Sequence, residues 1–184
     1  MDEITNDAER KMGGTVEHCR EEMGGIRTGR AHPAMFAKIM VEYYGTPTPL
    51  QQLATFQVPE ARTVLITPYD PGALKGIEKA IRNSDLGANP ASDGNLIRLV
   101  LPSLTEERRK EYIKLARTKA EENKVAIRNV RRAANEQVGK IKKNKEISED
   151  DAKHAEKKLD DLTKRYIEKI DELLKSKEAE LSEV

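Results

Sequence analysis

Basic residues recur at helical spacing between positions 110 and 132 and are the strongest candidates for chemistry in the chain. At 100° per residue, seven of them fall within an arc of about 100° on one side of a helix. These seven, called the cationic face below, are Lys110, Lys114, Arg117, Lys124, Arg128, Arg131 and Arg132. Within this arc of the sequence only Glu121 interrupts the positive charge.

Two interpretations of the cationic face stay open at this point. A charged helix face is commonly no more than a solvated surface. However, Arg128, Arg131 and Arg132 gather near one turn, and their planar guanidinium groups suit bidentate phosphate contacts. The cationic face therefore favours an anionic partner, and structured RNA recognised through its shape and backbone fits a rigid rod best.

No motif in the chain predicts a catalytic, metal or cofactor site. The sequence lacks GxxxxGK[ST], GxGxxG, GxSxG and HExxH. Cys19 adjoins His18, but neighbouring residues of a helix do not face each other, so we expect a buried thiol and no reactive pair. The acidic run at 149–151 could bind a cation, although helix capping explains it better. We expect no enzyme, no metal and no cofactor.

The composition of the chain as a whole predicts a long, thin molecule. Of 184 residues, 35% are charged and 37% hydrophobic, and the mean hydropathy is -0.73, which leaves too little apolar material for one large core. No apolar run approaches the roughly 18 residues of a membrane span, and the acidic start does not resemble a signal peptide. We therefore expect a cytoplasmic protein without a membrane partner.

Proline and charge divide the chain at the same places. All eight prolines lie between residues 33 and 102, and the flanks rich in Ala, Glu, Lys and Leu have none, as is typical of long helices. The 106–145 segment holds 14 basic and six acidic residues, a net charge of +8 that the overall +1 conceals.

The flanks predict a bundle of three helices. Apolar residues from 113 to 141 alternate at spacings of three and four, interrupted by Asn123 and Gln137, and indicate one helix from Thr105 to about Lys145. A second helix should begin at Ser148, and the first 28 residues carry a similar stripe, weakened by glycine pairs at 13–14 and 24–25. The short link at 145–148 makes the two long helices antiparallel.

The middle segment predicts a small α/β unit. Short β-prone runs lie at 39–43, 63–67 and 96–101. Between the last two, Asp70 and Pro71 are typical of a helix start and Gly87 of a cap at its end. The predicted fold is α+β: a three-helix bundle from residues 1–30 and 105–184, with a β/α/β domain inserted at 31–104.

The two chain crossings between these domains are short. The run from Arg27 to Pro33 is a typical helix stop signal, and the same position also suits a hinge, so both interpretations stay open. The candidate hinge residues are Gly29, Arg30, Ala31, Ser103, Leu104 and Thr105.

Several long motifs, in order along the chain, resemble the bacterial ribosome recycling factor family. They are RTGRA at 27–31, VEYYG at 41–45, SDLG at 84–87 with Asn89-Pro90, LTEERR at 104–109 and VAIRNVRR at 125–132. The resemblance covers essentially the whole length. It implies an L-shaped molecule with a flexible elbow between the bundle and the inserted domain.

The resemblance also implies a function and a set of RNA contacts. With elongation factor G and GTP, such a factor splits the post-termination ribosome into subunits near the peptidyl site of the large subunit, and we expect it to act as a monomer. Family contacts to large-subunit ribosomal RNA carry over to Arg27, Arg109, Arg128, Arg131 and Arg132. The alternative is a helical scaffold protein that binds no nucleic acid and whose cationic face is only solvated.

Overall fold

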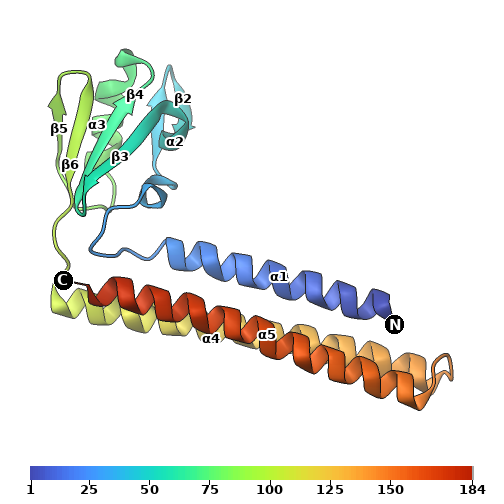
Figure 1. Cartoon of the computed structure of the whole chain (residues 1–184). Coiled ribbons are helices and arrows are strands. Elements are labelled where there is room, and N and C mark those ends of the chain that lie inside the picture. Colours follow the sequence, from blue (N-terminus) through green and yellow to red (C-terminus); the bar gives the residue numbers. More distant parts are fainter. Residues whose placement is uncertain (184) are drawn as a thin grey trace. The chain divides into compact units, whose positions relative to one another are not determined.

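The computed structural model describes residues 1–183 and confirms the α+β fold class, with a bundle of long helices and an inserted β-sheet domain (Figure 1). Contacts divide the chain into two compact units. The first holds Met1–Ile26 and Glu111–Ala179, and the second holds Arg27–Lys110 with the described residues from Glu180 onward. No helix within residues 1–183 is both long and apolar enough to cross a bilayer.

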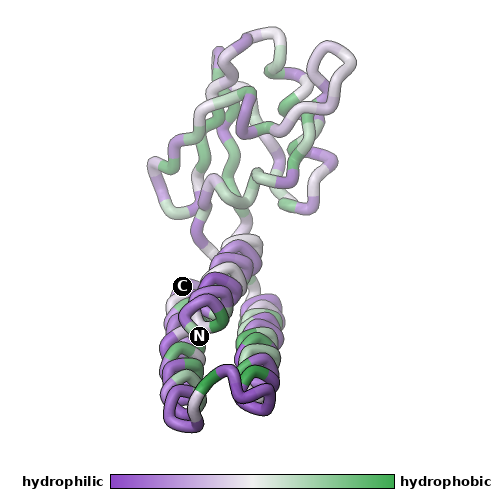
Figure 2. Tube along the Cα trace, turned by 90° about the vertical axis from the view of Figure 1, so that its right-hand side faces the viewer, coloured by the Kyte–Doolittle hydropathy of each residue, from purple (hydrophilic) through white to green (hydrophobic). Residues whose placement is uncertain are grey.

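The bundle consists of α1 (Asp2–Gly24), α4 (Glu106–Lys143) and α5 (Glu149–Ser182), with α4 antiparallel to the other two (Figure 1). Hydrophobic residues recur at intervals along helices that are otherwise hydrophilic (Figure 2). Their buried members confirm the predicted stripes and include Ala8, Met12, Val16, Cys19, Met23, Ala116, Ala120, Ile127, Ala134, Ala155, Leu159, Leu162, Tyr166 and Ile170. One narrow apolar seam therefore holds the three helices together.

The two polar residues that interrupt the α4 stripe have different places. Asn123 occupies a seam position, is 4% exposed, and donates through Nδ2 to Glu22 Oε1 at 3.0 Å and to the Lys119 carbonyl at 2.8 Å. Gln137 is exposed, and Val138 enters the core beside it. The amide nitrogen of Asn123 is thus satisfied inside the bundle.

The carboxylate of Glu22 links α1 to α4. Its Oε2 lies 3.2 Å from Lys119 Nζ, and its Oε1 lies 2.9 Å from His18 Nε2. The hydrogen bond from Asn123, followed by that from Lys119, holds the pKa of Glu22 below its ordinary value of 4.5. A charged Glu22 is therefore part of the folded bundle at neutral pH.

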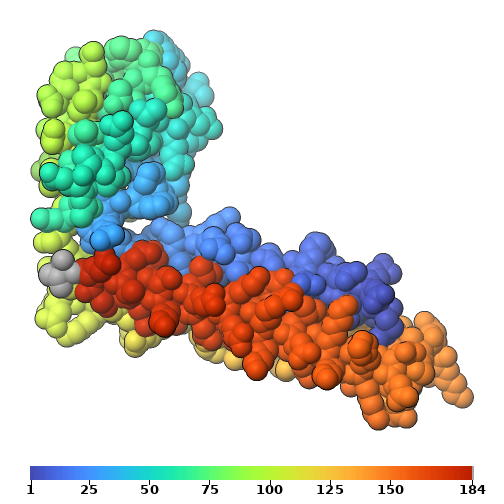
Figure 3. Space-filling model, viewed as in Figure 1, coloured from blue at the N-terminus to red at the C-terminus, as the bar shows by residue number. Residues whose placement is uncertain are grey.

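The glycine pair at 13–14 does not break α1. A Cβ atom built at Gly13 would lie 3.9 Å from Cε1 of Tyr166, and one at Gly14 would meet nothing within 4 Å. Helix α1 lies beside α5 on the face shown in Figure 3, and the Tyr166 hydroxyl donates to Glu9 Oε1 at 3.2 Å. Packing against α5 thus holds the helix despite its glycines.

A tight turn joins α4 to α5. Lys145 has a left-handed φ of 59°, and Ser148 then caps α5 by accepting from the Asp151 backbone N–H at 3.0 Å. The Ser148 hydroxyl also donates to the Asp151 carboxylate at 2.7 Å. Helix capping by Ser148, predicted from the sequence, is confirmed.

The inserted domain contains two antiparallel sheets. A hairpin joins β1 (Met40–Tyr43) to β2 (Thr46–Pro49). The larger sheet has the order β3-β4-β6-β5, from β3 (Ala54–Glu60), β4 (Thr63–Pro68), β5 (Pro90–Asp93) and β6 (Leu96–Val100). The helical pieces are η1 (Pro33–Phe36), α2 (Leu50–Leu53), η2 (Pro71–Ala73) and α3 (Leu74–Arg82).

The domain has its own core. Fully buried side chains from the strands and from α3 pack around Phe36, whose ring stacks on Phe56 with centroids 5.0 Å apart. They include Val41, Leu50, Val64, Ile66, Ile77, Ile81, Ile97 and Leu99. Helix α3 packs on this core through Ile77 and Ile81, as its predicted stripe requires.

Two features of the domain differ from the prediction. The strands β2, β3 and β5 were not predicted, because they contain Pro47, Pro49, Pro59 and Pro90, and proline lacks the donor that a central strand needs. The cap at Gly87 is wrong: α3 ends at Arg82, since Ser84 donates through its backbone N and its Oγ to the Ile81 carbonyl, at 3.1 and 2.6 Å. Gly87 lies in the following loop with φ +66°.

The α4 register can be tested with two substitutions on the same helix. Ile127→Asp should lower the free energy of unfolding by about 3 kcal/mol or more, because it places an unpaired carboxylate in the seam, where Ile127 is fully buried. Val125→Asp is the matched control, since Val125 is 46% exposed and should tolerate the charge. Denaturant unfolding followed by circular dichroism measures both, and equal midpoints would refute the register and the cationic face derived from it.

The Glu22 contacts predict a pH-dependent contribution to stability. The folded-state pKa of Glu22 is lowered, so its charged carboxylate stabilises the fold fully above about pH 4.5, the ordinary pKa of the group. This contribution is lost as the pH falls through the folded-state pKa. The wild type should melt at a higher temperature than Glu22→Gln at pH 7, and the two should converge in acid. Glu21→Gln, at an exposed neighbouring position, should match the wild type throughout. A melting-temperature gap for Glu22→Gln that is independent of pH would contradict the assignment.

Candidate nucleic-acid interface

Helix α4 positions the cationic face. Thr105 caps it, with Oγ1 accepting from the Arg108 backbone N–H at 3.2 Å, and the helix then continues unbroken for 38 residues. At 1.5 Å per residue it is about 57 Å long. Because the seam fixes which side of α4 is buried, it also fixes which side carries the basic residues.

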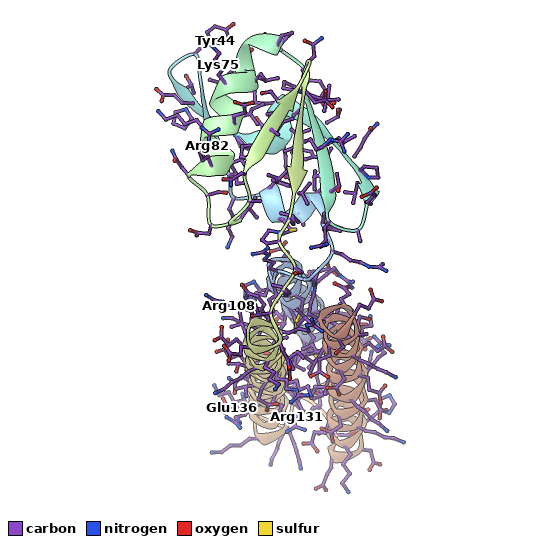
Figure 4. The ribbon with its side chains drawn as sticks, turned by 90° about the vertical axis from the view of Figure 1, so that its left-hand side faces the viewer. Tyr44, Lys75, Arg82, Arg108, Arg131 and Glu136 are labelled. Atoms are coloured by element: carbon purple, nitrogen blue, oxygen red, sulfur yellow. The ribbon has the colours of Figure 1, made fainter. Side chains whose placement is uncertain are left out.

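One edge of the cationic face lies against α5. Arg117 Nε is 2.5 Å from Glu178 Oε1, Arg131 Nη1 is 3.5 Å from Asp160 Oδ1, and Lys124 forms an ion pair with Asp171. Arg131 lies between α4 and α5 in Figure 4. The expectation that only Glu121 interrupts the positive charge therefore holds for the arc over residues 110–132 of α4 but not for the surface, to which α5 adds three carboxylates.

The other edge of the cationic face, called the open edge below, points away from α5. It consists of Lys110, Lys114, Arg128 and Arg132, all exposed, and extends over about 33 Å of the helix. Arg128 lies 3.3 Å from Glu121 and Lys110 lies 2.8 Å from Glu106, both on α4. Lys114 and Arg132 form no ion pair with any of residues 1–183.

These ion pairs leave the basic groups available to an anionic ligand. Exposed pairs contribute roughly 0–1 kcal/mol each, and salt screens them. A phosphate can therefore replace the carboxylate partner of Arg128 or Lys110 at little cost in free energy. Arg132 and Lys114 have no carboxylate partner among residues 1–183 to be replaced. The open edge is the part of the cationic face best suited to bind phosphates.

Arg27 and Arg109 lie apart from the cationic face. Arg27 Nη2 donates to the Pro102 carbonyl at 3.1 Å, and Arg109 Nη2 donates to the Leu104 carbonyl at 3.4 Å. Arg109 precedes Ala116 by one heptad and so lies on the seam side of α4. Both arginines thus hold the second chain crossing, and their role in RNA contact stays a prediction.

The first crossing is held by local hydrogen bonds. Thr28 is buried, and its Oγ1 accepts from Arg30 N at 3.3 Å and donates to Arg30 O at 3.1 Å. Ala31 N donates to the Ala61 carbonyl at 2.6 Å, and Arg30 Nε lies 2.9 Å from Glu183 Oε2. Gly29 lies between these anchors with no neighbour closer than 3.9 Å to an added Cβ.

A cluster around Asp70 in the inserted domain was not predicted. Asp70 Oδ2 accepts from the Tyr43 hydroxyl at 2.7 Å and from the Tyr44 hydroxyl at 3.3 Å, while Oδ1 accepts from Gly72 N at 2.8 Å. The hydrogen bond to Asp70 raises the pKa of Tyr43 to about 12 and lowers that of Asp70. The signal in the sequence is Tyr44-Gly45, a turn with an aromatic residue at its tip.

The described residues offer no alternative centre of chemistry. Within residues 1–183 no three His, Cys, Asp or Glu side chains are grouped so as to hold a metal ion. Cys19 is fully buried, as predicted, and burial raises the pKa of its thiol, which makes it a poor nucleophile.

Known proteins similar to this chain agree with one another. The model of one protein family, described as "Ribosome recycling factor", matches residues 19–181. A ribosome-recycling factor of Cutibacterium acnes is 67% identical over 184 residues, the whole of both chains, and one of Kineococcus radiotolerans is 61% identical over 181 residues, 98% of each.

Two solved structures are similar over nearly the whole chain, each at 43% identity. One, titled as the solution structure of the ribosome recycling factor, has a TM-score of 0.80 and covers 100% of this chain and 97% of its own. The other is titled as a model of the T. thermophilus ribosome recycling factor and E. coli elongation factor G bound to the E. coli post-termination complex. Its TM-score is 0.70, over 98% of this chain and 97% of its own.

Proposed function

The chain belongs to the ribosome recycling factor family, and from this premise we propose that the open edge of the cationic face is its main contact with ribosomal RNA. Its function is ribosome recycling. With elongation factor G and GTP it promotes dissociation of the post-termination ribosome into subunits and release from mRNA. It is a translation factor and not an enzyme. We place it in the cytoplasm, with the ribosomes on which it acts.

The observation that carries the RNA contact is the position of Arg132 and Lys114 on the open edge without an acidic partner among residues 1–183. Arg128 stands beside them with a single exposed carboxylate neighbour. Guanidinium and ammonium groups spaced along a rigid helix match the phosphates of folded RNA. We assign this contact to large-subunit RNA near the peptidyl site, with Arg131 at its margin and with Arg27 and Arg109 as further contacts.

We also propose that the chain divides functionally into the bundle, residues 1–30 and 105–184, and the inserted domain, residues 31–104. Gly29, Arg30 and Ala31 form one crossing, and Ser103, Leu104 and Thr105 form the other. Neither crossing contains a helix or strand that would stiffen it before α4 begins. Short irregular links of this kind absorb backbone rotation, so the two crossings together form a hinge.

Charge reversal tests the RNA contact. The double variant Arg128→Glu/Arg132→Glu should bind 70S ribosomes at least about tenfold more weakly, because phosphates are repelled where they were bound. Its melting temperature should change little, since both side chains are exposed. Cosedimentation at several salt concentrations measures the affinity and its salt dependence.

A matched control uses Lys158→Glu/Lys164→Glu, which makes the same change in charge on α5. Both side chains are exposed, and neither lies on α4. The control should bind ribosomes more tightly than the α4 variant. Equal binding of the two double variants, or binding that does not change with salt, would favour the scaffold function.

A crosslink tests the hinge. Cysteines at positions 30 and 104 of a Cys19→Ala chain, joined by a short bismaleimide, should leave ribosome binding intact and slow GTP-dependent splitting with elongation factor G. The reason is that the bundle supplies the RNA affinity while splitting requires rotation at the crossings. Light scattering follows splitting, and each single-cysteine chain treated with the reagent is the control. Unchanged splitting by a fully crosslinked chain would exclude a required hinge motion.

A further inference from the structure

Helix α3 of the inserted domain carries a second, smaller basic surface. Lys75, Lys79 and Arg82, called the α3 face below, fall within an arc of about 60° and extend over about 10 Å of the helix. All three are exposed and lie on the side opposite the buried Ile77 and Ile81. Half of the six basic residues between 31 and 104 thus lie on a helix of only nine residues.

Three of the six acidic residues of the domain have partners outside the α3 face. Asp70 binds two tyrosine hydroxyls, Asp93 lies 3.9 Å from Arg98, and Glu78 accepts a hydrogen bond from Ser92 on β5. No carboxylate among residues 1–183 forms an ion pair with Lys75, Lys79 or Arg82. The domain as a whole is neutral, so this separation of charge leaves one locally positive helix side.

Tyr44 projects at the amino-terminal end of the α3 face. It is 82% exposed, and its backbone is left-handed, with φ +48°, in the two-residue turn that joins β1 to β2. Glycine and asparagine suit such a position, whereas an aromatic residue there is strained. An aromatic side chain therefore does not help the backbone of this turn, and the fold leaves most of it exposed.

The Tyr44 ring is nevertheless held in place. Its hydroxyl donates to Asp70, its ring meets that of Tyr43 edge to face with centroids 4.5 Å apart, and Asp70 also caps the turn that leads into α3. Gly76 of α3 packs directly on β1, where an added Cβ would lie 3.3 Å from the Glu42 carbonyl. Tyr44, Lys75 and Arg82 accordingly lie on one side of the domain (Figure 4).

We propose that Tyr44 and the α3 face form a second RNA-binding surface, which takes an unpaired RNA segment with a base stacked on Tyr44 and its phosphates along Lys75, Lys79 and Arg82. This inference rests on the ribosomal function proposed above and adds a contact to it. Exposed aromatic rings beside cations are the usual means by which proteins hold single-stranded RNA.

An acidic protein surface would also be attracted to three cations, but it would make no use of Tyr44. A fixed, solvent-exposed ring with a free face offers stacking to a base, whereas protein interfaces bury such a ring in a complementary pocket. The aromatic residue at a strained position therefore favours RNA. A protein partner is the competing outcome of the experiments below.

Substitutions at Tyr44 separate binding from folding. Tyr44→Asn suits the left-handed turn, so the melting temperature should stay equal or rise, while affinity for post-termination 70S ribosomes should fall about fivefold or more through loss of stacking. Tyr44→Phe keeps the ring and should bind like the wild type. A Tyr44→Asn chain that binds normally would overturn the role of Tyr44.

Neutralising the α3 face tests the phosphate contacts. Affinity falls as salt rises, and each contact to a phosphate of single-stranded RNA adds about 0.7 to the steepness of log affinity against log salt. Lys75→Gln/Lys79→Gln/Arg82→Gln should therefore make this slope shallower by about 2. Lys38→Gln/Arg62→Gln/Arg98→Gln, which removes the other three basic residues of the domain, should leave the slope nearly unchanged. Equal slopes for the two triple variants would reject the α3 face as an RNA contact.

A photocrosslink identifies the partner. Benzoylphenylalanine at position 79 of the full chain, bound to post-termination ribosomes, should give an adduct that nuclease digests, whereas the same residue at position 62 should not. An adduct that nuclease leaves unchanged in size would show a protein partner and refute the proposal. Arg128→Glu/Arg132→Glu measured in parallel separates the two hypotheses, because a failure of the α4 contact alone leaves the α3 result unchanged.

Discussion

Burial of one narrow apolar seam by three helices is the constraint on which the functional surface depends. A chain with 35% charged residues has little apolar surface to bury, and a long thin bundle uses it efficiently because each helix needs only one stripe. Once Ala116, Ala120 and Ile127 face the seam, helical geometry leaves no freedom in the direction of Arg128 and Arg132. The same residues that stabilise the bundle therefore aim its basic groups outward.

Neighbouring helices then decide which of those basic groups are available. The α5 carboxylates Asp160, Asp171 and Glu178 neutralise the edge of the cationic face that lies beside them and help to fix α4 against α5. The open edge keeps its charge because no helix covers it. One stripe of basic residues thus serves both packing, along the edge beside α5, and binding, along the open edge. The exposed ion pairs on this stripe are weak, so the phosphates of a polyanion can replace their carboxylates.

The bundle could be predicted from the sequence almost entirely, because period, caps and proline placement all agree there. The seam residues, the start of α4 at Thr105 and the start of α5 at Ser148 follow from local rules alone. Contacts between helices do not follow from local rules. The ion pairs of α4 with α5 and the Asn123–Glu22 contact depend on how separate segments of the chain meet. The strands with Pro47, Pro59 and Pro90 were missed for a similar reason, since sheet pairing is decided by distant residues.

The buried polar contacts of the bundle have a further consequence for its register. Three helices with similar apolar stripes could slide past one another by a heptad with little loss of apolar contact. Asn123 opposes such a slide, because only one alignment gives its Nδ2 the Glu22 carboxylate of α1 and gives Glu22 the ammonium of Lys119. A slipped bundle would leave the buried Asn123 amide only its bond to the Lys119 carbonyl of its own helix, and losing the bond to the charged Glu22 costs more than an exposed ion pair contributes. The position of the open edge along the bundle, and not only its direction, is therefore set by one polar residue in an otherwise apolar seam.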